Sequence, residues 1–341
     1  MKRRIALLVV LTVAVALAPG LSAYLRFGVQ VGNRVILLKW AQMPVRYFIT
    51  NRDVPGVTAP QLQTAVASAF SAWSNVPTAQ LSAQFGGFVS ADPGNSDGVT
   101  VIGFLARPDL DRVLGATTHS IDNVTGAIVE SDIFLNTKRD ATTPLDWSVA
   151  ANGETGRFDV QSISTHEIGH LLGLGHSALG ETELLANTNG GRRILGKNAV
   201  MFPIAFPAGN IADRVLKPDD IAGMAGIYPT SAFTGSLGSI SGRVTLNNAG
   251  LFGAHVTAFN PSTGALVGAF TLDQQGTFTI DGLPPGVYAL RVEPLDDGDI
   301  DSFFDPDAPV NINFKAAYYS KLVAVPAGGA GPAIEIRVQS K

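Results

Sequence analysis

The chain has 341 residues, enough for two domains, and 46% of them are hydrophobic against 15% charged, which excludes an intrinsically disordered protein. The net charge of -4, with no basic run beyond the extreme N-terminus, argues against nucleic acid as a partner. There is no cysteine, so disulfides and thiolate ligands are excluded, and any metal site must use histidine and carboxylate groups.

The N-terminus has the pattern of an export signal. A basic segment at residues 2–4 precedes an apolar run over residues 5–18, and small residues up to Ala23 offer a cleavage site. The run is short for crossing about 30 Å of hydrocarbon, so cleavage is favoured over an uncleaved anchor. We therefore expect residues 1–23 to be a signal peptide, and the mature protein to be secreted, extracellular or periplasmic, with no stable membrane span.

Strands and one helix are predicted next. Residues 45–50 have the pattern of a strand, and Thr58 with Gln61 has the spacing of a capping box that begins a helix. The helix carries an apolar stripe at three- and four-residue steps, made of Leu62, Ala65, Val66, Ala69, Phe70 and Trp73. Further strands are predicted over residues 80–85, 99–104, 114–119 and 127–135. This mixture favours an α/β or α+β domain.

The segment from His166 to His176 reads His-Glu-Ile-Gly-His-Leu-Leu-Gly-Leu-Gly-His, on a helix with Asp159 as its predicted N-cap. His166 and His170 are four residues apart, so on a helix they share one face and can bind one zinc ion. An amphipathic core helix is the simpler alternative. It would explain the leucines, but not the presence of three of the chain's five histidines.

Two further positions complete this motif. Glu167 lies beside the first histidine, where its carboxylate can accept a proton from an attacking water without being a metal ligand. His176 is out of register with a continuing helix. Gly173 resolves this conflict, because a residue that accepts positive φ can end the helix and turn the chain back toward the metal.

The helical period disappears after His176. Residues 187–193 are polar and Gly-rich and are predicted to be a loop, and Met201 lies in a tight apolar turn. A proline-bearing loop over residues 204–216 precedes a last helix from Pro218 to Tyr228.

The character of the chain changes near Thr230. Short alternating strands with turn residues predict an all-β sandwich after a linker. They lie at residues 239–246, 254–259, 265–272, 277–280, 287–292 and 334–338. The expected division is residues 24–230 for the first domain, 231–238 for the linker and 239–341 for the β-sandwich.

Residues 166–177 resemble the zinc-binding signature of the matrixins, a metzincin family of metallopeptidases. Met201 is similar to the family's Met-turn, and Asp219 and Asp220 are similar to the start of its C-terminal helix. The resemblance implies an α+β zincin domain with a twisted five-stranded sheet and three helices. It also implies that His166, His170 and His176 bind one catalytic zinc, with supporting roles for the turn and the helix.

The chain departs from the animal matrixins in ways that are similar to bacterial members. There is no cysteine, and we expect no prodomain, because few residues lie between the predicted signal and the first catalytic strand. The histidines of a second, structural zinc are also missing, and we expect no such ion. Calcium is a possible second ion, because Asp92, Asp97, Asp122 and Asp132 offer oxygen ligands. Solvated turn carboxylates are the simpler interpretation of these four residues.

Residues 239–292 resemble the carboxypeptidase regulatory-like module, a prealbumin-like sandwich. The resemblance lies in turn and core residues, such as Gly242-Arg243-Val244 and the turn over residues 282–288. It implies a noncatalytic accessory domain.

Together these features predict a secreted, monomeric zinc metalloendopeptidase (EC 3.4.24.-) that acts on protein or peptide substrates, with extracellular matrix as one possible setting. Glu167 would be the general base for a zinc-activated water. Ile204, Phe206 and Leu216 predict an apolar pocket for the side chain after the scissile bond. Two alternatives stay open: a noncatalytic secreted binding protein on a protease scaffold, and a zinc hydrolase of a non-protein amide.

Overall fold

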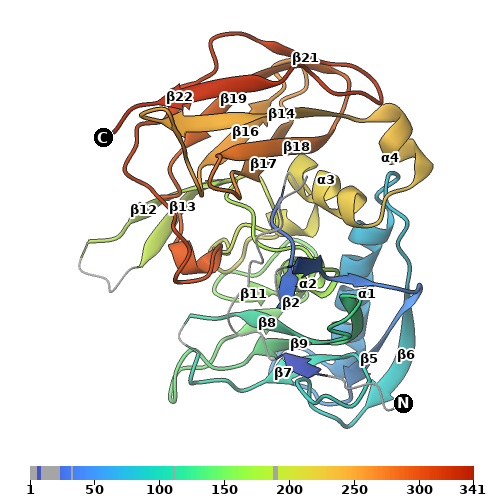
Figure 1. Ribbon diagram of the computed structural model, residues 1–341. Coiled ribbons are helices and arrows are strands. Elements are labelled where there is room, and N and C mark those ends of the chain that lie inside the picture. The colour runs from blue at the N-terminus through green and yellow to red at the C-terminus, as the bar shows by residue number, and fades with distance from the viewer. Residues whose placement is uncertain (1–5, 9–23, 32–33, 111, 187–190) are drawn as a thin grey trace.

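The computed structural model describes residues 6–8, 24–31, 34–110, 112–186 and 191–341, and the predicted signal peptide lies almost entirely outside them. A mixed half around α2 (Val160–Leu171) lies below a β-rich half formed by the C-terminal residues (Figure 1). None of the helices in the described ranges has both the length and the hydrophobicity that crossing a membrane requires.

The lower half is built on a twisted sheet whose five main strands run in the order β8-β9-β7-β5-β6. Strands β5, β6, β7 and β9 are parallel to one another, and β8 is antiparallel to β9. Two short strands, β1 and β4, extend this sheet. The bounds are β1 (Ala6–Leu8), β4 (Lys39–Trp40), β5 (Val45–Thr50), β6 (Ala83–Val89), β7 (Val101–Leu105), β8 (Gly115–Ile121) and β9 (Ala127–Asn136). The predicted α+β class is confirmed, and the predicted sheet of five strands carries two further short strands in the structure.

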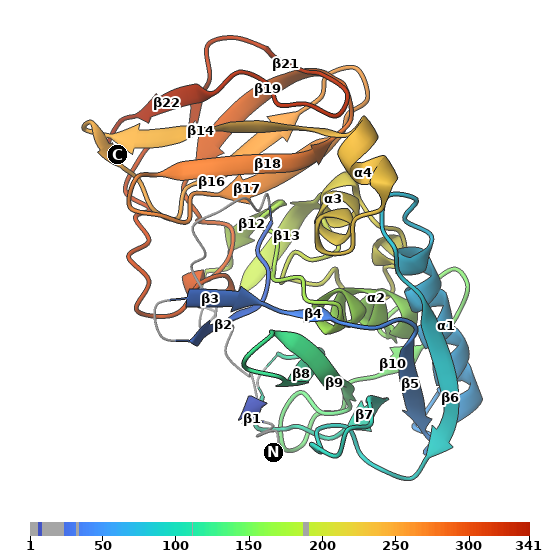
Figure 2. The same cartoon turned by 45° about the vertical axis from the view of Figure 1, so that its right-hand side comes forward.

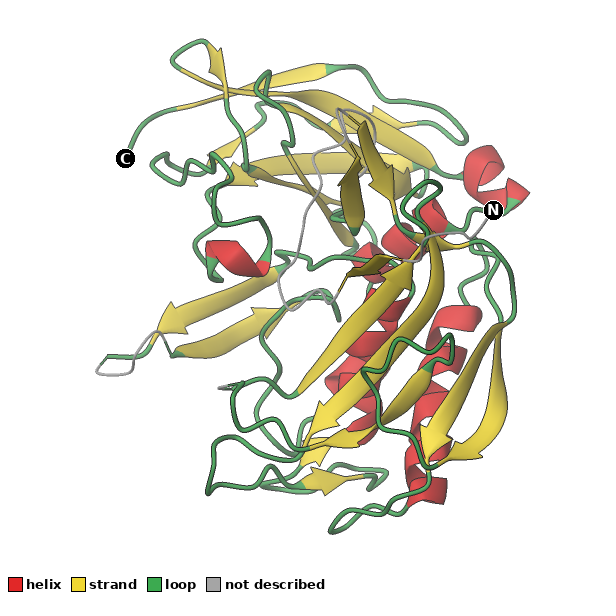
Figure 3. Ribbon diagram, turned by 60° about the horizontal axis from the view of Figure 1, so that its bottom comes forward, coloured by secondary structure: helices red, strands yellow, loops and turns green. Residues whose placement is uncertain are grey.

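Helix α1 (Ala59–Ser74) begins at the predicted capping box. The Thr58 main-chain N–H donates to Gln61 Oε1 at 2.8 Å, and the Gln61 N–H donates to Thr58 Oγ1 at 3.4 Å. Every residue of the predicted apolar stripe is buried, which confirms it. Trp73 Nε1 donates to the Thr165 carbonyl of α2 at 2.8 Å, so α1 and α2 lie side by side against the sheet (Figure 3).

Helix α2 begins after Asp159, as predicted. Asp159 Oδ1 accepts from the Ser162 N–H at 2.7 Å, which satisfies one of the free donors of the first turn. Its other oxygen forms an ion pair with Arg214 at 2.5 Å. Arg214 closes the 3₁₀ turn η1 (Ala212–Arg214), so the cap also holds the loop that follows Met201.

The segment between His176 and Met201 contains a hairpin that the sequence did not predict. Strand β12 (Gly180–Leu184) pairs with β13 (Arg192–Lys197), so the predicted loop over residues 187–193 is wrong at its C-terminal end. The hairpin has little apolar alternation of its own. Its support comes from a cross-strand ion pair between Arg193 and Glu183 at 2.6 Å and from contacts with the C-terminal domain.

The chain then enters α3 (Pro218–Ile227), which confirms the predicted last helix. The predicted linker over residues 231–238 is partly helical, since α4 spans Ser231–Ser236. Thr230 precedes this helix with an extended backbone, and a short helix of six residues therefore joins the two halves (Figure 2).

The C-terminal half is a sandwich of two sheets, as predicted. One sheet has the order β15-β14-β18 with β22 beside β14, and the other has the order β17-β16-β19-β20 with β21 beside β19. The bounds are β14 (Gly238–Leu246), β15 (Ala249–Gly250), β16 (His255–Phe259), β17 (Leu266–Phe270), β18 (Thr277–Leu283), β19 (Gly286–Glu293), β20 (Ala317–Tyr318), β21 (Val323–Val325) and β22 (Ile334–Val338). Three smaller elements complete the fold: the pair β2 (Gly28–Val31) and β3 (Arg34–Leu37), the pair β10 (Trp147–Ser148) and β11 (Phe158–Asp159), and the 3₁₀ turn η2 (Ile300–Ser302).

The two halves share a hydrophobic core. One cluster of buried side chains joins residues of the first half to residues of the sandwich, and comprises Leu25, Ala178, Phe202, Phe252, Phe270, Leu295, Phe303 and Phe304. Helix α3 contacts β17 and β18. The interface is therefore packed as a protein interior and not bridged by a free linker.

Candidate metal centre

Helix α2 and the turn that follows it bring the three histidines of the motif together. His166 and His170 lie on α2, which ends at Leu171. Gly173 has a φ of +102°. Its N–H donates to the His170 carbonyl at 2.8 Å, and the Leu174 N–H donates to the Gly169 carbonyl at 3.0 Å. This is the Schellman arrangement of a helix C-terminus, and it turns the chain so that His176 returns to the other two histidines.

The imidazole Nε2 atoms of these residues converge. His170 Nε2 lies 3.1 Å from His166 Nε2 and 3.2 Å from His176 Nε2. Across the described ranges, this is the one group of three or more histidine, cysteine or acidic side chains whose ligand atoms lie within 4.8 Å of one another. We call it the three-histidine group.

The opposite nitrogen of each ring faces a main-chain carbonyl oxygen. The pairs are His166 Nδ1 with Val200 at 2.7 Å, His170 Nδ1 with Leu174 at 2.8 Å and His176 Nδ1 with Ser302 at 2.6 Å. A carbonyl only accepts, so each Nδ1 carries the proton and each neutral Nε2 presents a lone pair.

Three lone pairs at this separation cannot hydrogen-bond to one another, whereas a cation would satisfy all of them. Three imidazole nitrogens with a fourth position open are a donor set that zinc prefers in hydrolytic sites. The residues therefore fit a zinc ion.

Burial keeps the rings neutral. It lowers the pKa of His176 to about 4, and it lowers the pKa values of His166 and His170 well below the usual value. The neighbouring imidazoles add to the effect at His166 and His170, because a second positive charge nearby would be repelled. Neutral imidazole is the form that binds a metal ion.

Glu167 points away from the helix toward strand β8. Its Oε2 accepts from Thr117 Oγ1 at 2.8 Å, and the same hydroxyl lies 3.0 Å from the Glu167 carbonyl oxygen. A Cβ at Gly115 would lie 3.0 Å from Oε1, so a side chain at this position would crowd the carboxylate. Burial raises the pKa of Glu167 to about 7, against the opposing effect of the Thr117 hydroxyl. Sequence reasoning missed both Gly115 and Thr117, since strand alternation does not say which helix residue a strand faces.

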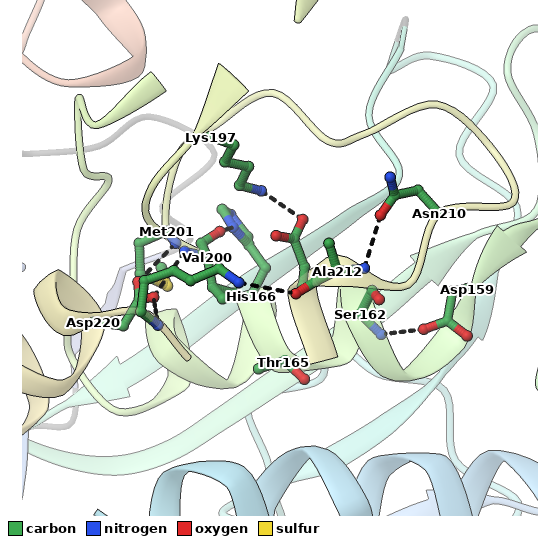
Figure 4. Close-up of polar contacts among 12 residues, drawn as sticks. Asp159, Ser162, Thr165, His166, Lys197, Val200, Met201, Asn210, Ala212 and Asp220 are labelled. Carbon is green, nitrogen blue, oxygen red and sulfur yellow. Dashed lines mark hydrogen bonds and ion pairs between the residues drawn. The ribbon is translucent and has the colours of Figure 1, made fainter. Parts of the chain in front are cut away.

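Met201 lies under α2, at the level of Gly169 between the two helical histidines. A Cβ at Gly169 would overlap the Met201 sulfur. Asp220 holds the turn around Met201, because its carboxylate accepts from the N–H groups of Val200 at 2.8 Å and Met201 at 3.1 Å (Figure 4). The Val200 carbonyl in turn accepts from His166, so Asp220 orients this histidine through the turn.

Asp219 links Ser177, the residue after His176, to the sandwich. Its Oδ2 accepts from Ser177 Oγ at 2.7 Å, and its Oδ1 accepts from the Gly268 N–H of β17 at 2.8 Å. Burial raises the pKa of Asp220 to about 7, and the adjacent Asp219 charge adds to this effect. Both carboxylates thus have structural partners and lie away from the converging Nε2 atoms.

Replacing Asp220 with alanine should lower the free energy of unfolding by at least about 2 kcal/mol, because it leaves the Val200, Met201 and Lys217 N–H groups without their acceptor. Urea unfolding of the full chain measures this effect. Asp109→Ala, which removes an exposed carboxylate, is the control and should stay within about 0.5 kcal/mol of wild type. Equal stabilities of the two variants would contradict the role of Asp220.

A buried ion pair lies next to the three-histidine group. Lys197 Nζ contacts Asp213 Oδ2 at 2.7 Å, and both side chains are almost fully buried (Figure 4). The pair ties the end of β13 to η1, which lies within the loop over residues 204–216. Ile204, Phe206 and Leu216 in and beside this loop are half-buried, and the apolar pocket expected there stays a prediction.

The carboxylates considered as calcium ligands contact other groups of the protein. Asp132 accepts from the Val101 N–H at 2.7 Å and the Gly94 N–H at 2.5 Å, Asp122 accepts from two N–H groups of its own turn, and Asp92 pairs with Arg52. These contacts agree with solvated or structural carboxylates. His119 is buried against Phe27, with ring centroids 5.5 Å apart, and is not part of the three-histidine group.

A mixed α+β domain with a three-histidine group at the end of α2, followed by a β-sandwich, agrees with the zincin-type fold expected from the sequence. Residues 39–189 match the family model described as Matrixin, and residues 239–296 match the one described as Carboxypeptidase regulatory-like domain. Residues 39–189 are therefore a matrixin-type domain, and a C-terminal β-rich domain follows them. The matrixin match ends before Met201 and α3, so the similarity of these two elements rests on their residues and contacts.

Curated relatives agree with this assignment. The chain is 29% identical over 196 residues to "Metalloendoproteinase 1-MMP" of Arabidopsis thaliana, a match that covers 56% of the chain and 44% of that protein. It is 30% identical over 141 residues to "Metalloendoproteinase 5-MMP" of the same plant, covering 38% and 31%. The chain therefore spans less than half the length of these relatives. Among solved structures, the match to "The Bacillus anthracis TIE protein" covers 31% of this chain and 17% of that chain at 16% identity. Its TM-score is 0.22.

Proposed function

We propose that the protein is a secreted zinc endopeptidase, and that His166, His170 and His176 are its metal ligands. The observation that carries the proposal is the convergence of three Nε2 lone pairs, each fixed by a carbonyl at the opposite ring nitrogen. The matrixin assignment supports the reaction class. Zinc supplies a Lewis acid that polarises a carbonyl group and increases the acidity of water.

The chain's own residues would handle the proton. Glu167 would accept it from the attacking water at its carboxylate and deliver it to the nitrogen of the leaving amine. The raised pKa of Glu167, near 7, suits a group that both takes up and releases a proton at neutral pH. Thr117 would hold the carboxylate in place by its hydrogen bond to Oε2, and Gly115 would keep the space beside it open.

The proposals for substrate preference, secretion and quaternary structure rest on the sequence and not on the three-histidine group. The apolar residues of the loop over positions 204–216 favour a hydrophobic side chain after the scissile bond. The basic and apolar pattern of residues 1–23 supports export. A monomer is the expected state, and the β-sandwich is the proposed accessory domain from about residue 239 onward.

Removing the metal should abolish activity. Treatment with 1,10-phenanthroline is expected to lower casein or gelatin cleavage by more than about 100-fold, since the Lewis acid is lost while the protein stays folded. Activity is measured by zymography and with a quenched peptide, and stoichiometric zinc should restore it. A serine-peptidase inhibitor is the control and should have no effect.

The same experiment decides between the alternatives. Cleavage that resists the chelator would contradict the zinc mechanism. A purified, zinc-loaded protein that cleaves neither protein nor peptide would exclude the endopeptidase. Cleavage of a cell-wall amide would then favour the zinc hydrolase of a non-protein amide, and no cleavage at all would favour the noncatalytic binding protein.

A further inference from the structure

The third histidine of the group is held by the C-terminal domain. His166 and His170 donate to carbonyl oxygens of the first half, at Val200 and Leu174. His176 donates instead to the Ser302 carbonyl, 126 positions away in the sequence, at 2.6 Å. Ser302 lies in η2, between β19 and β20 of the sandwich.

Hydrogen bonds and packing hold the segment that carries this carbonyl. The 3₁₀ turn is closed by hydrogen bonds from the Ser302 N–H to Asp299 at 2.9 Å and from the Phe303 N–H to Ile300 at 3.0 Å. Phe303 is fully buried, and its ring lies 6.2 Å from the His176 ring and 6.0 Å from Phe270 of β17. The ring therefore packs between the histidine and the sandwich and fixes where the carbonyl points.

The segment before η2 is also hydrogen-bonded to the hairpin β12–β13, which follows His176 in the chain. The β12 residue Thr182 donates from its N–H to Asp297 Oδ1 and from its Oγ1 to the Asp297 carbonyl, both at 2.7 Å. Arg192 of β13 donates to the Asp296 carbonyl at 2.9 Å. Since β12 begins four residues after His176, these bonds tie the segment before η2 to the chain that follows this ligand.

We propose that the C-terminal β-sandwich completes the metal centre, with Ser302 and Phe303 as positioning residues for His176. The inference rests on the proposed zinc site and gives the accessory domain a role in metal affinity. The Ser302 carbonyl holds the proton on Nδ1 and leaves Nε2 free to bind the ion. Without this acceptor the ring is free to rotate and to present either nitrogen. Loss of such an outer partner typically costs about 10–100-fold in metal affinity.

The test uses the full-length chain and measures zinc affinity by competition with a chromophoric chelator. Phe303→Ala should weaken zinc binding by about tenfold or more, and Phe303→Leu, which keeps most of the packing, by about threefold. The visible absorption of the cobalt-substituted protein should change for Phe303→Ala, because His176 changes orientation. Phe278→Ala is the matched control: it removes an equally buried phenylalanine from β18, in the sheet of the sandwich formed with β14. It should lower thermal stability and leave the affinity and the cobalt spectrum unchanged.

The outcomes separate this inference from the proposed function. Zinc affinity of Phe303→Ala equal to that of Phe278→Ala would overturn the inference, while a loss of affinity in His176→Gln would still support the zinc site. Unchanged zinc affinity in His176→Gln would overturn both. If Phe303→Ala does not fold, Phe303→Leu decides: wild-type affinity in this variant overturns the inference, and a loss that Phe278→Ala does not share supports it.

Discussion

Replacing Glu167 with alanine should leave the protein able to bind zinc and lower kcat/KM for peptide hydrolysis by at least about 100- to 10,000-fold, the usual contribution of a general acid–base group. The carboxylate is buried and bonded to Thr117, so it lies beside the three-histidine group without belonging to it. The helix should survive the change, because alanine is the best helix former. Hydrolysis of a quenched peptide and zinc content by atomic absorption are the two measurements.

Two variants serve as controls for this result. Glu154→Ala removes a half-exposed carboxylate that bonds to Ser148 and Arg157, and it should retain nearly full activity. Thr117→Val removes only the hydroxyl that holds Glu167, and should lower kcat by a smaller factor than Glu167→Ala does. Activity of Glu167→Ala close to that of wild type would show that the role is wrongly assigned. Loss of zinc from this variant would show that Glu167 helps to hold the ion.

Replacing His170 with alanine should remove bound zinc and all measurable peptidase activity. His170 is the buried, central member of the group, 3.1 and 3.2 Å from its two neighbours, and a site with two imidazoles does not close around zinc. The zinc content of the purified variant and its hydrolysis of the same peptide measure the effect.

His119→Ala is the matched control for His170→Ala. His119 is equally buried in the same half of the molecule, and its ring nitrogens have no hydrogen-bond partner among the described residues. Its removal should cost stability and leave one zinc per chain. Unchanged zinc content in His170→Ala, or loss of zinc from His119→Ala alone, would contradict the assignment of the ligands.

The elements that the sequence predicted correctly depend on local patterns. Helix α1 follows from a capping box and an apolar stripe, both contained within 16 consecutive positions, from Thr58 to Trp73. Strand β5 begins where the alternating pattern predicts it, and helix α3 begins at Pro218, as predicted. The spacing of His166 and His170 puts them on one face of α2, and Gly173 supplies the positive φ that the return of His176 requires.

The elements that the sequence did not predict depend on partners distant along the chain. The hairpin β12–β13 has weak alternation and is supported by Asp297 of the other half. The linker helix α4 has six residues with one large apolar side chain, Phe233, and therefore no apolar period, so nothing in its pattern separates it from a loop. In the same way, no local pattern reveals that Thr117 of β8 faces Glu167 across 50 positions.

By itself, the sequence determined the chemistry of this protein: three imidazoles and a carboxylate at spacings that one helix and one glycine turn can bring together. Residue type and short-range geometry suffice for this, because helix periodicity and the left-handed preference of glycine act within a few positions. Only the tertiary structure decided how each group is held. Asp220 supports the Met201 turn, Thr117 holds Glu167, and Ser302 of the second domain orients His176. Such contacts depend on how sheets and domains pack, and packing is set by the whole core rather than by any local stretch of sequence.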